Sequence, residues 1–155
     1  MTEQPTIDAS RPGLLRWQLS LTWSLAEHHL AGCTQEFLLW EPVPGCASVR
    51  LDGTGRWWPD WNDEDPDALP GVSAGWISWH LGWWWSETLG HVAGREPVPR
   101  AEVSWPGSAE AAAEWLRALH GRWSDHLASL ADDDLDRRSP IRGRSRARSR
   151  SPRPG

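Results

Sequence analysis

The chain has 155 residues, about the length of one domain. Apolar residues make up 39% of it and charged residues 24%, which allows a globular core and excludes a wholly disordered chain. No apolar run reaches the roughly 18 residues needed to cross a bilayer, and the polar start does not resemble a secretory signal. We therefore expect a cytoplasmic protein that does not bind membranes. Its two cysteines, Cys33 and Cys46, are expected to be reduced thiols.

The charge is divided unevenly along the chain. Residues 1–136 hold all 21 acidic residues and eight arginines, a net charge of −13. Residues 137–155 hold eight arginines and no acidic residue, and they contain almost no apolar side chains. This division predicts a folded domain over residues 1–136 and a disordered Arg/Ser-rich tail over residues 137–155.

The first predicted element is one long helix over residues 12–40. Apolar residues recur there at steps of three and four, beginning with Leu15, Leu19 and Trp23, which is the spacing of one helical face. Ser10 is placed to cap the helix, and the Glu41-Pro42 pair ends it, since the residue before a proline avoids the helical region. Such a helix would be about 43 Å long.

The connection that follows is roughly 33 residues long, which is long for a compact domain and indicates structure or function. Val49, Leu51 and Trp57 alternate with other residues around the sequence Asp52-Gly53-Thr54-Gly55, a pattern that predicts a small β-hairpin. After Trp58 the chain continues into an acidic stretch before Pro70, predicted to be a loop anchored by its indoles.

Two more helices are predicted, the first over residues 74–93 with Ser73 as its cap and Gly94 as its end. Its apolar stripe comprises Ile77, Leu81, Trp84, Trp85, Thr88 and Val92, while Trp76, Trp79 and Trp83 are expected to pack under the crossover or to line a pocket. The next helix begins after Ser108 and is expected to end near Ala131. Its apolar face comprises Ala112, Leu116, Leu119, Trp123, Leu127 and Leu130.

Several of these strings resemble the DinB-like superfamily, which includes the maleylpyruvate isomerase-like bundles, and more narrowly its uncharacterised actinobacterial branch. They are Leu21-Thr22-Trp23-Ser24-Leu25, Phe37-Leu38-Leu39-Trp40-Glu41-Pro42, Gly75-Trp76-Ile77-Ser78-Trp79-His80-Leu81-Gly82-Trp83-Trp84-Trp85 and Val103-Ser104-Trp105-Pro106-Gly107. The resemblance covers roughly residues 14–136. It implies an all-α, up-down-down-up four-helix bundle with a long first crossover. Some members of this superfamily are thiol-dependent transferases or isomerases.

The resemblance also implies a metal ligand at His80. Many family members hold a divalent metal with one histidine from the second helix, which His80 matches, and two from the fourth. This sequence has no His-x-x-x-His pair, and the Arg/Ser-rich tail follows Asp136 where the fourth helix would begin. We therefore expect an incomplete bundle of three helices and a degraded site with low occupancy by Zn, Ni or Fe. The alternative for His80 is a partly buried histidine satisfied by a carbonyl or an indole.

The remaining candidate residues have weaker patterns. Glu87 and His91 are expected to form a surface contact one helical turn apart. Cys33 is expected to be an inert apolar side chain, whereas Cys46 in the crossover is a candidate reactive thiol. The other four histidines are expected at solvent edges or helix caps: His28, His29, His120 and His126.

Three functions stay open on the sequence alone. The first is metal-dependent, thiol-transferase-like chemistry at a degraded site. The second is a non-enzymatic interaction module, because a bundle without its fourth helix exposes an apolar groove that favours a homo-dimer or other self-association. The third is RNA binding through the Arg-rich tail, which the net charge of −13 on residues 1–136 opposes, so a nucleic-acid partner is disfavoured.

Overall fold

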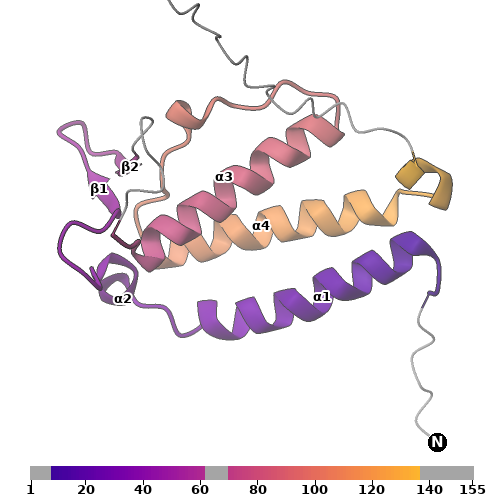
Figure 1. Ribbon diagram of the computed structural model, residues 1–155, viewed down its shortest axis with the longest axis horizontal. Helices are drawn as coiled ribbons and strands as arrows, with labels where there is room; N and C mark the ends of the chain where they lie inside the picture. The colour runs from indigo at the N-terminus through magenta and orange to yellow at the C-terminus, as the bar shows by residue number, and fades with distance from the viewer. Residues whose placement is uncertain (1–7, 62–69, 137–155) are drawn as a thin grey trace, which may run out of the picture.

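The computed structural model describes residues 8–61 and 70–136, and it is mainly helical (Figure 1). Three long helices and one short helix are joined by a crossover that carries a two-stranded hairpin. The elements are α1 (Arg11–Leu30), α2 (Gln35–Leu39), β1 (Val49–Leu51), β2 (Trp57–Pro59), α3 (Ala74–Val92) and α4 (Ala109–Ala128), with short 3-10 turns η2 (Arg100–Glu102) and η3 (Asp132–Asp136). The predicted disordered tail over residues 137–155 and most of the predicted acidic loop lie outside the described residues.

Each of the three long helices begins at a serine, as the sequence predicts. The hydroxyls of Ser10, Ser73 and Ser108 each accept a hydrogen bond from the backbone N–H three residues later, at 3.1 Å. Each serine has extended backbone angles, so it stands just outside its helix and satisfies one otherwise unpaired N–H.

The prediction of a single helix over residues 12–40 is wrong. α1 ends at Leu30, and a new helix, α2, begins after Thr34, whose hydroxyl accepts a hydrogen bond from the N–H of Phe37 at 3.2 Å. The turn between them contains Gly32, a residue that disfavours helix interiors. The cap at Thr34 therefore starts a second helix. The apolar spacing of three and four residues continues from α1 into α2, so it does not indicate the break between them.

The three long helices form a layer with α4 in contact with both α1 and α3. α1 is antiparallel to α4, because Glu27 near the end of α1 binds Arg117 while Arg11 at its start binds Asp136 beyond α4. α3 and α4 run in the same direction (Figure 1). This up-down-down order is the one that the resemblance implies for the first three helices.

The predicted hairpin is confirmed, with β1 and β2 antiparallel and Leu51 opposite Trp57. Its turn is organised by the carboxylate of Asp52. One oxygen accepts hydrogen bonds from the Thr54 hydroxyl at 2.7 Å and from the N–H groups of Thr54 and Arg56, and the other accepts from the indole of Trp58 at 2.7 Å. These bonds, the Thr54 hydroxyl foremost, lower the pKa of Asp52 from 3.8 to about 2.

This hydrogen-bonded carboxylate gives the hairpin turn an expected pH dependence. Because the folded pKa is the lower one, the stabilisation from Asp52 is complete above pH 3.8 and is lost as the pH falls through about 2. NMR titration of the Asp52 carboxyl carbon is expected to give a midpoint near 2, and the amides of Thr54 and Arg56 should shift with it. In Asp52→Asn these amides should show no such step, and a midpoint at the ordinary value near 3.8 would contradict the turn geometry.

The core lies where the crossover meets the first turns of α3 and α4. Trp79 has no exposed surface and Trp105 has 2%, and they pack with three smaller side chains: Leu38, Val49 and Ala112. Both buried indoles have hydrogen-bond acceptors, since Trp79 Nε1 donates to the carbonyl of Val103 at 2.7 Å and Trp105 Nε1 donates to Ser78 Oγ at 2.9 Å. The crossover is therefore part of the core, and the expectation that Trp79 packs beneath it is confirmed.

The predicted apolar stripe of α3 is not its buried side. Ile77 is 52% exposed and Trp84 is 50% exposed. The fully buried residues of α3 are Gly75, Ser78, Trp79, Gly82, Leu89 and Gly90. Because α3 is apolar on more than one side, periodicity does not identify its contact side, and the small residues decide it: the Trp115 ring of α4 occupies the space beside Gly82.

The two cysteines are both free, as expected, and the candidate reactive thiol, Cys46, is the more buried of the two. Cys46 lies within the crossover and is 1% exposed, whereas Cys33 is half-buried. A thiolate forms poorly without solvent or a nearby cation, so burial argues against Cys46 as a reactive thiol.

Among the described helices, none combines the length and apolar content that a membrane span needs.

Candidate functional site

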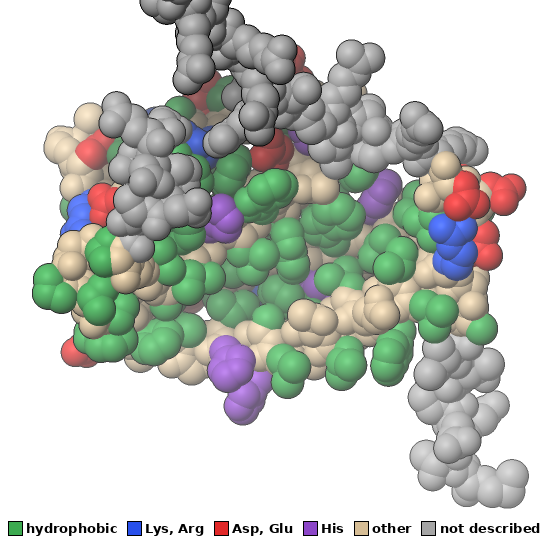
Figure 2. All heavy atoms as spheres, viewed as in Figure 1, with side chains coloured by type: hydrophobic (Ala, Val, Ile, Leu, Met, Phe, Trp, Pro, Cys, Tyr) green, Lys and Arg blue, Asp and Glu red, His purple; other side chains and the backbone are tan. Residues whose placement is uncertain are grey.

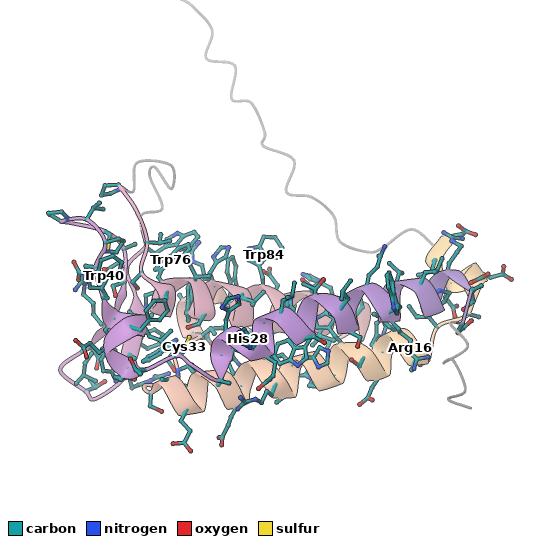
Figure 3. The ribbon with its side chains drawn as sticks, turned by 90° about the horizontal axis from the view of Figure 1, so that it is seen from below. Arg16, His28, Cys33, Trp40, Trp76 and Trp84 are labelled. Atoms are coloured by element: carbon teal, nitrogen blue, oxygen red, sulfur yellow. The ribbon has the colours of Figure 1, made fainter. Side chains whose placement is uncertain are left out.

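His80 lies on α3 within a group of tryptophan rings, which we call the His80 box: Trp61, Trp76, Trp83 and Trp84. The imidazole is stacked on the indole of Trp76 with 4.8 Å between ring centroids and an angle of 12°. Trp61, from the crossover, lies parallel to it at 6.2 Å. Figure 3 shows Trp76 and Trp84 on the side of α3 away from α4. The box thus combines one side of α3 with Trp61, two residues after β2 in the crossover.

The environment of His80 keeps its ring neutral. Burial lowers the pKa of His80 below 6.5, because the charged form loses hydration among the indoles. Its Nδ1 atom is buried and has no hydrogen-bond partner. A neutral imidazole with an unpaired nitrogen is the form that binds a metal ion, so this single side chain meets the first requirement of a ligand.

Among the described residues, the rest of a metal centre is not present around His80. Within residues 8–61 and 70–136, no three His, Cys, Asp or Glu side chains lie close enough together to hold one ion. Glu87 and His91 form the expected contact one turn apart, with 4.0 Å between Oε1 and Nε2, but they lie two turns beyond His80. The described residues therefore do not fit a metal cofactor, and His80 as a metal ligand stays a prediction.

Of the other histidines, His120 differs most from its expected place at a solvent edge. It lies between α1 and α4, stacked on the indole of Trp23 at 4.4 Å and 10°. Burial lowers the pKa of His120, with a smaller opposing effect from the charge of Glu27. Trp23 also contacts Trp85 of α3 at 6.1 Å, so one α1 side chain contacts both of the other long helices.

The surface that extends from α1 across to α3, facing the viewer in Figure 2, is mainly apolar. Figure 2 shows hydrophobic side chains gathered over this surface, with histidines among them. On α3, Ile77 and Trp84 are each about half exposed. This is the surface on which the sequence predicts an open groove.

A second exposed apolar surface lies on α1, and the sequence analysis missed it. We call it the α1 stripe: Leu14, Trp17, Leu21 and Leu25, which are 45%, 49%, 54% and 64% exposed. Their spacing of three, four and four residues puts them on one side of the helix. On the predicted face, Leu19 and Trp23 are partly buried, whereas Leu15 is 39% exposed. α1 therefore has two apolar sides, and the signal for the second was present in the same periodicity.

Figure 3 views the molecule from the α1 side, with α1 in front of the other two long helices. From Leu14 to Leu30, no residue of α1 is fully buried, and its buried residues are Pro12 and Gly13 in the first turn. The α1 stripe is thus left on the surface by the described part of the fold, where charged or polar side chains are usual.

Comparison with protein families matches the chain to the DinB superfamily over residues 18–151. The match begins within α1, spans the crossover and the other long helices, and runs past Asp136 into the segment assigned to the tail. Comparison with curated proteins and with solved structures gives no match. Some DinB proteins bind metals, but the described residues form no metal-binding group. From its family match over most of its length, the chain belongs to the DinB superfamily.

Proposed function

We propose that this chain is a protein association module whose partner is a second copy of itself, bound through the α1 stripe. The observation that carries the proposal is the exposure of four large apolar side chains in line on one helix, between 45% and 64% each. Monomeric soluble proteins seldom leave such contiguous apolar surface in water, because its burial is favourable at about 25 cal/mol per Å².

The charge of α1 favours a second copy over a charged partner. Residues 17–26 contain no charged side chain. The charged residues on either side of this segment are Arg16 and Glu27, and Glu27 is bound to Arg117 of α4 through hydrogen bonds of 2.6–3.1 Å. Residues 1–136 carry a net charge of −13, so two copies repel each other over much of their surface. The α1 stripe is a place where they can meet without opposing like charges.

The spacing of the stripe also suits pairing with itself. In an antiparallel pair of helices, Leu14 would face the partner's Leu25 and Trp17 would face the partner's Leu21. The same four side chains then fill both halves of the contact, which is the requirement for a two-fold symmetric interface. The aromatic Trp17 near its centre is a residue type enriched in interface hot spots.

The other functions have less support. A metal-dependent, thiol-transferase-like reaction needs ligands besides His80, and no three candidate ligands among the described residues lie within one coordination sphere. RNA binding rests on residues 137–155, which lie outside the described residues. We also propose that the chain belongs to the uncharacterised actinobacterial branch of the superfamily, because its tryptophan-rich strings resemble that branch.

Sedimentation velocity over a range of protein concentrations tests the proposed dimer. We expect the full chain to dimerise and Leu21→Glu to weaken dimerisation roughly a hundredfold or more, since each interface would bury two unpaired carboxylates. Leu21 is 54% exposed, so the fold of the variant should be intact by circular dichroism.

Two further variants locate the contact. Val98→Glu is the matched control, because Val98 is 55% exposed but lies in the loop after α3, and it should dimerise like the unmodified chain. Ile77→Glu tests the groove between α1 and α3. A monomeric unmodified chain would contradict the proposal, as would dissociation by Ile77→Glu with Leu21→Glu unaffected. Stoichiometric bound metal that is lost in His80→Ala would instead support the metal-dependent function.

A further inference from the structure

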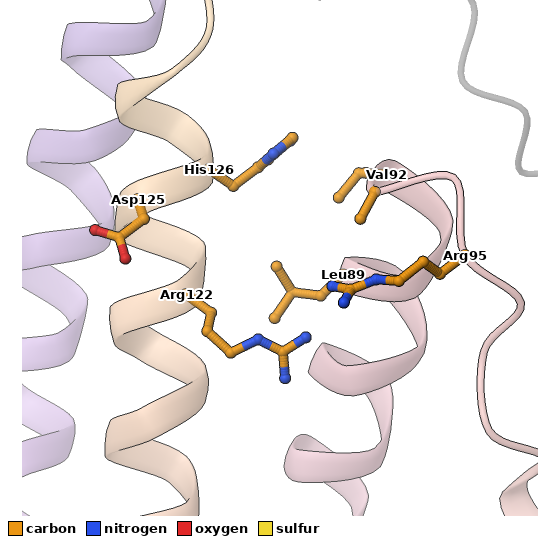
Figure 4. A pocket seen from close by; sticks show the side chains of 7 residues that line it. Leu89, Val92, Arg95, Arg122, Asp125 and His126 are labelled. Carbon is orange, nitrogen blue, oxygen red and sulfur yellow. The ribbon is translucent and has the colours of Figure 1, made fainter.

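A cavity of about 220 Å³ lies between the last turns of α3 and α4, at the opposite end of these helices from the core. Figure 4 shows the side chains that line it, which include Leu89, Val92, Arg95, Arg122, Asp125 and His126. It is separate from the His80 box, since it shares no residue with it. Neither the sequence analysis nor the family match assigns it a role.

The local sequence explains how Arg95 reaches this cavity. α3 ends at Val92, and Gly94 adopts a positive φ of 66°, the conformation that commonly follows a helix end. The turn brings the N–H of Arg95 back to the carbonyl of Gly90 at 2.9 Å, so the side chain of Arg95 lies over the end of α3. The carbonyls of Leu89, Gly90 and His91 all accept backbone hydrogen bonds there, so an anion would not face unpaired helix-end oxygens.

Two arginines extend toward the cavity from its two walls. In Figure 4 the guanidinium groups of Arg122 on α4 and Arg95 beyond α3 point toward one another, while the carboxylate of Asp125 points the other way, toward α1. Across the described part of the chain, neither arginine pairs with a carboxylate. By contrast, each of three other arginines does so at 2.6–2.9 Å: Arg11, Arg50 and Arg117.

The two guanidinium groups thus lie together without a paired carboxylate among the described residues. A cation near the C-terminus of a helix is favourable on its own, which accounts for Arg95 just beyond the end of α3. It does not account for two guanidinium groups directed into one cavity, since like charges held together repel each other. An anion between them would convert that repulsion into two charge-assisted interactions, and the planar forks of arginine match a carboxylate well.

The other lining residues and the volume of the cavity restrict the polarity and size of the ligand. Leu89 is 4% exposed and, with Val92, provides apolar surface beside the two cations. The cavity volume lies below the range of about 300–1,000 Å³ that holds drug-sized ligands, so the ligand must be small. We propose that this cavity binds a small organic carboxylate with an apolar body, its carboxylate between Arg95 and Arg122 and its body against Leu89 and Val92.

Isothermal titration of the full chain with benzoate tests this site. We expect benzoate to bind, and Arg122→Gln and Arg95→Gln each to weaken binding roughly tenfold or more, the usual effect of losing one charged hydrogen-bond partner. Benzamide, which has the same shape without the charge, should not bind. The matched control is Arg16→Gln, which removes the same charge from α1 and should leave benzoate affinity unchanged.

Two results would overturn the proposal. Equal benzoate affinity in the unmodified chain, Arg122→Gln and Arg16→Gln would show that other arginines, including the eight in residues 137–155, hold the anion. Inorganic phosphate binding as tightly as benzoate would show that the apolar walls contribute nothing. Circular dichroism of each variant checks folding, and the exposed positions of Arg95 and Arg122 predict that all three variants fold.

Discussion

Replacing Trp79 by alanine is expected to lower the free energy of unfolding by about 3–5 kcal/mol. Trp79 has no exposed surface, and its ring packs with Leu38, Val49 and Ala112, which come from three different parts of the chain. Removing the indole leaves a large cavity and deprives the carbonyl of Val103 of its donor. Urea unfolding followed by circular dichroism measures the loss.

The matched control for this substitution is Trp40→Ala. Trp40 is 61% exposed, so the same change of side chain should alter the free energy of unfolding by only about 0.5 kcal/mol. Equal losses in the two variants would mean that the crossover does not pack on Trp79 as described. Trp79→Phe should lie between them, because it restores most of the ring volume without the Nε1 donor.

Gly82→Ala is expected to destabilise the protein by about 1–3 kcal/mol, although alanine is the better helix former. A Cβ at position 82 would overlap the indole ring of Trp115 on α4. The comparison is Gly121→Ala on α4, where a Cβ would meet no other atom. That variant should gain up to about 1 kcal/mol from helix propensity alone. The two identical substitutions are thus expected to have opposite signs in thermal or urea unfolding.

A double variant identifies the cause of the Gly82 effect. With Trp115→Leu already in place, Gly82→Ala should cost less than it does alone, because the smaller side chain leaves room for the new methyl group. If the losses in the free energy of unfolding from the two substitutions were strictly additive, or if Gly82→Ala were stabilising, α3 and α4 would not be in close contact at Gly82.

The helix starts and the hairpin could be predicted because they depend on short-range chemistry. Ser10, Ser73 and Ser108 each act on an N–H only three residues away, and the Asp52 turn is complete within a few residues. The end of α1 could not be placed, since an apolar spacing of three and four continues across Gly32 into α2. The periodicity of apolar residues indicates which residues share one side of a helix, but it does not indicate where the helix ends.

The contact sides of the helices and the candidate site were predicted only in part. The sequence pointed to His80 and to tryptophans under the crossover, and the structure stacks His80 on Trp76 and buries Trp79. It did not reveal that α3 packs through its glycines, because the space beside Gly82 is taken by a ring from a helix more than 30 residues away. The convergence of Arg95 and Arg122 likewise depends on two helices lying side by side, which no local pattern encodes.

The position of α1 at the margin of the layer makes it a separable cooperative unit. Its main contacts are with α4 and η3, and Trp23 also contacts Trp85 of α3. Ion pairs hold it near its two ends, Arg11 to Asp136 and Glu27 to Arg117. The core around Trp79 and Trp105 contains no α1 residue. Detachment of this helix would leave that core closed, so we expect the amides of α1 to exchange through a local opening that needs less free energy than global unfolding.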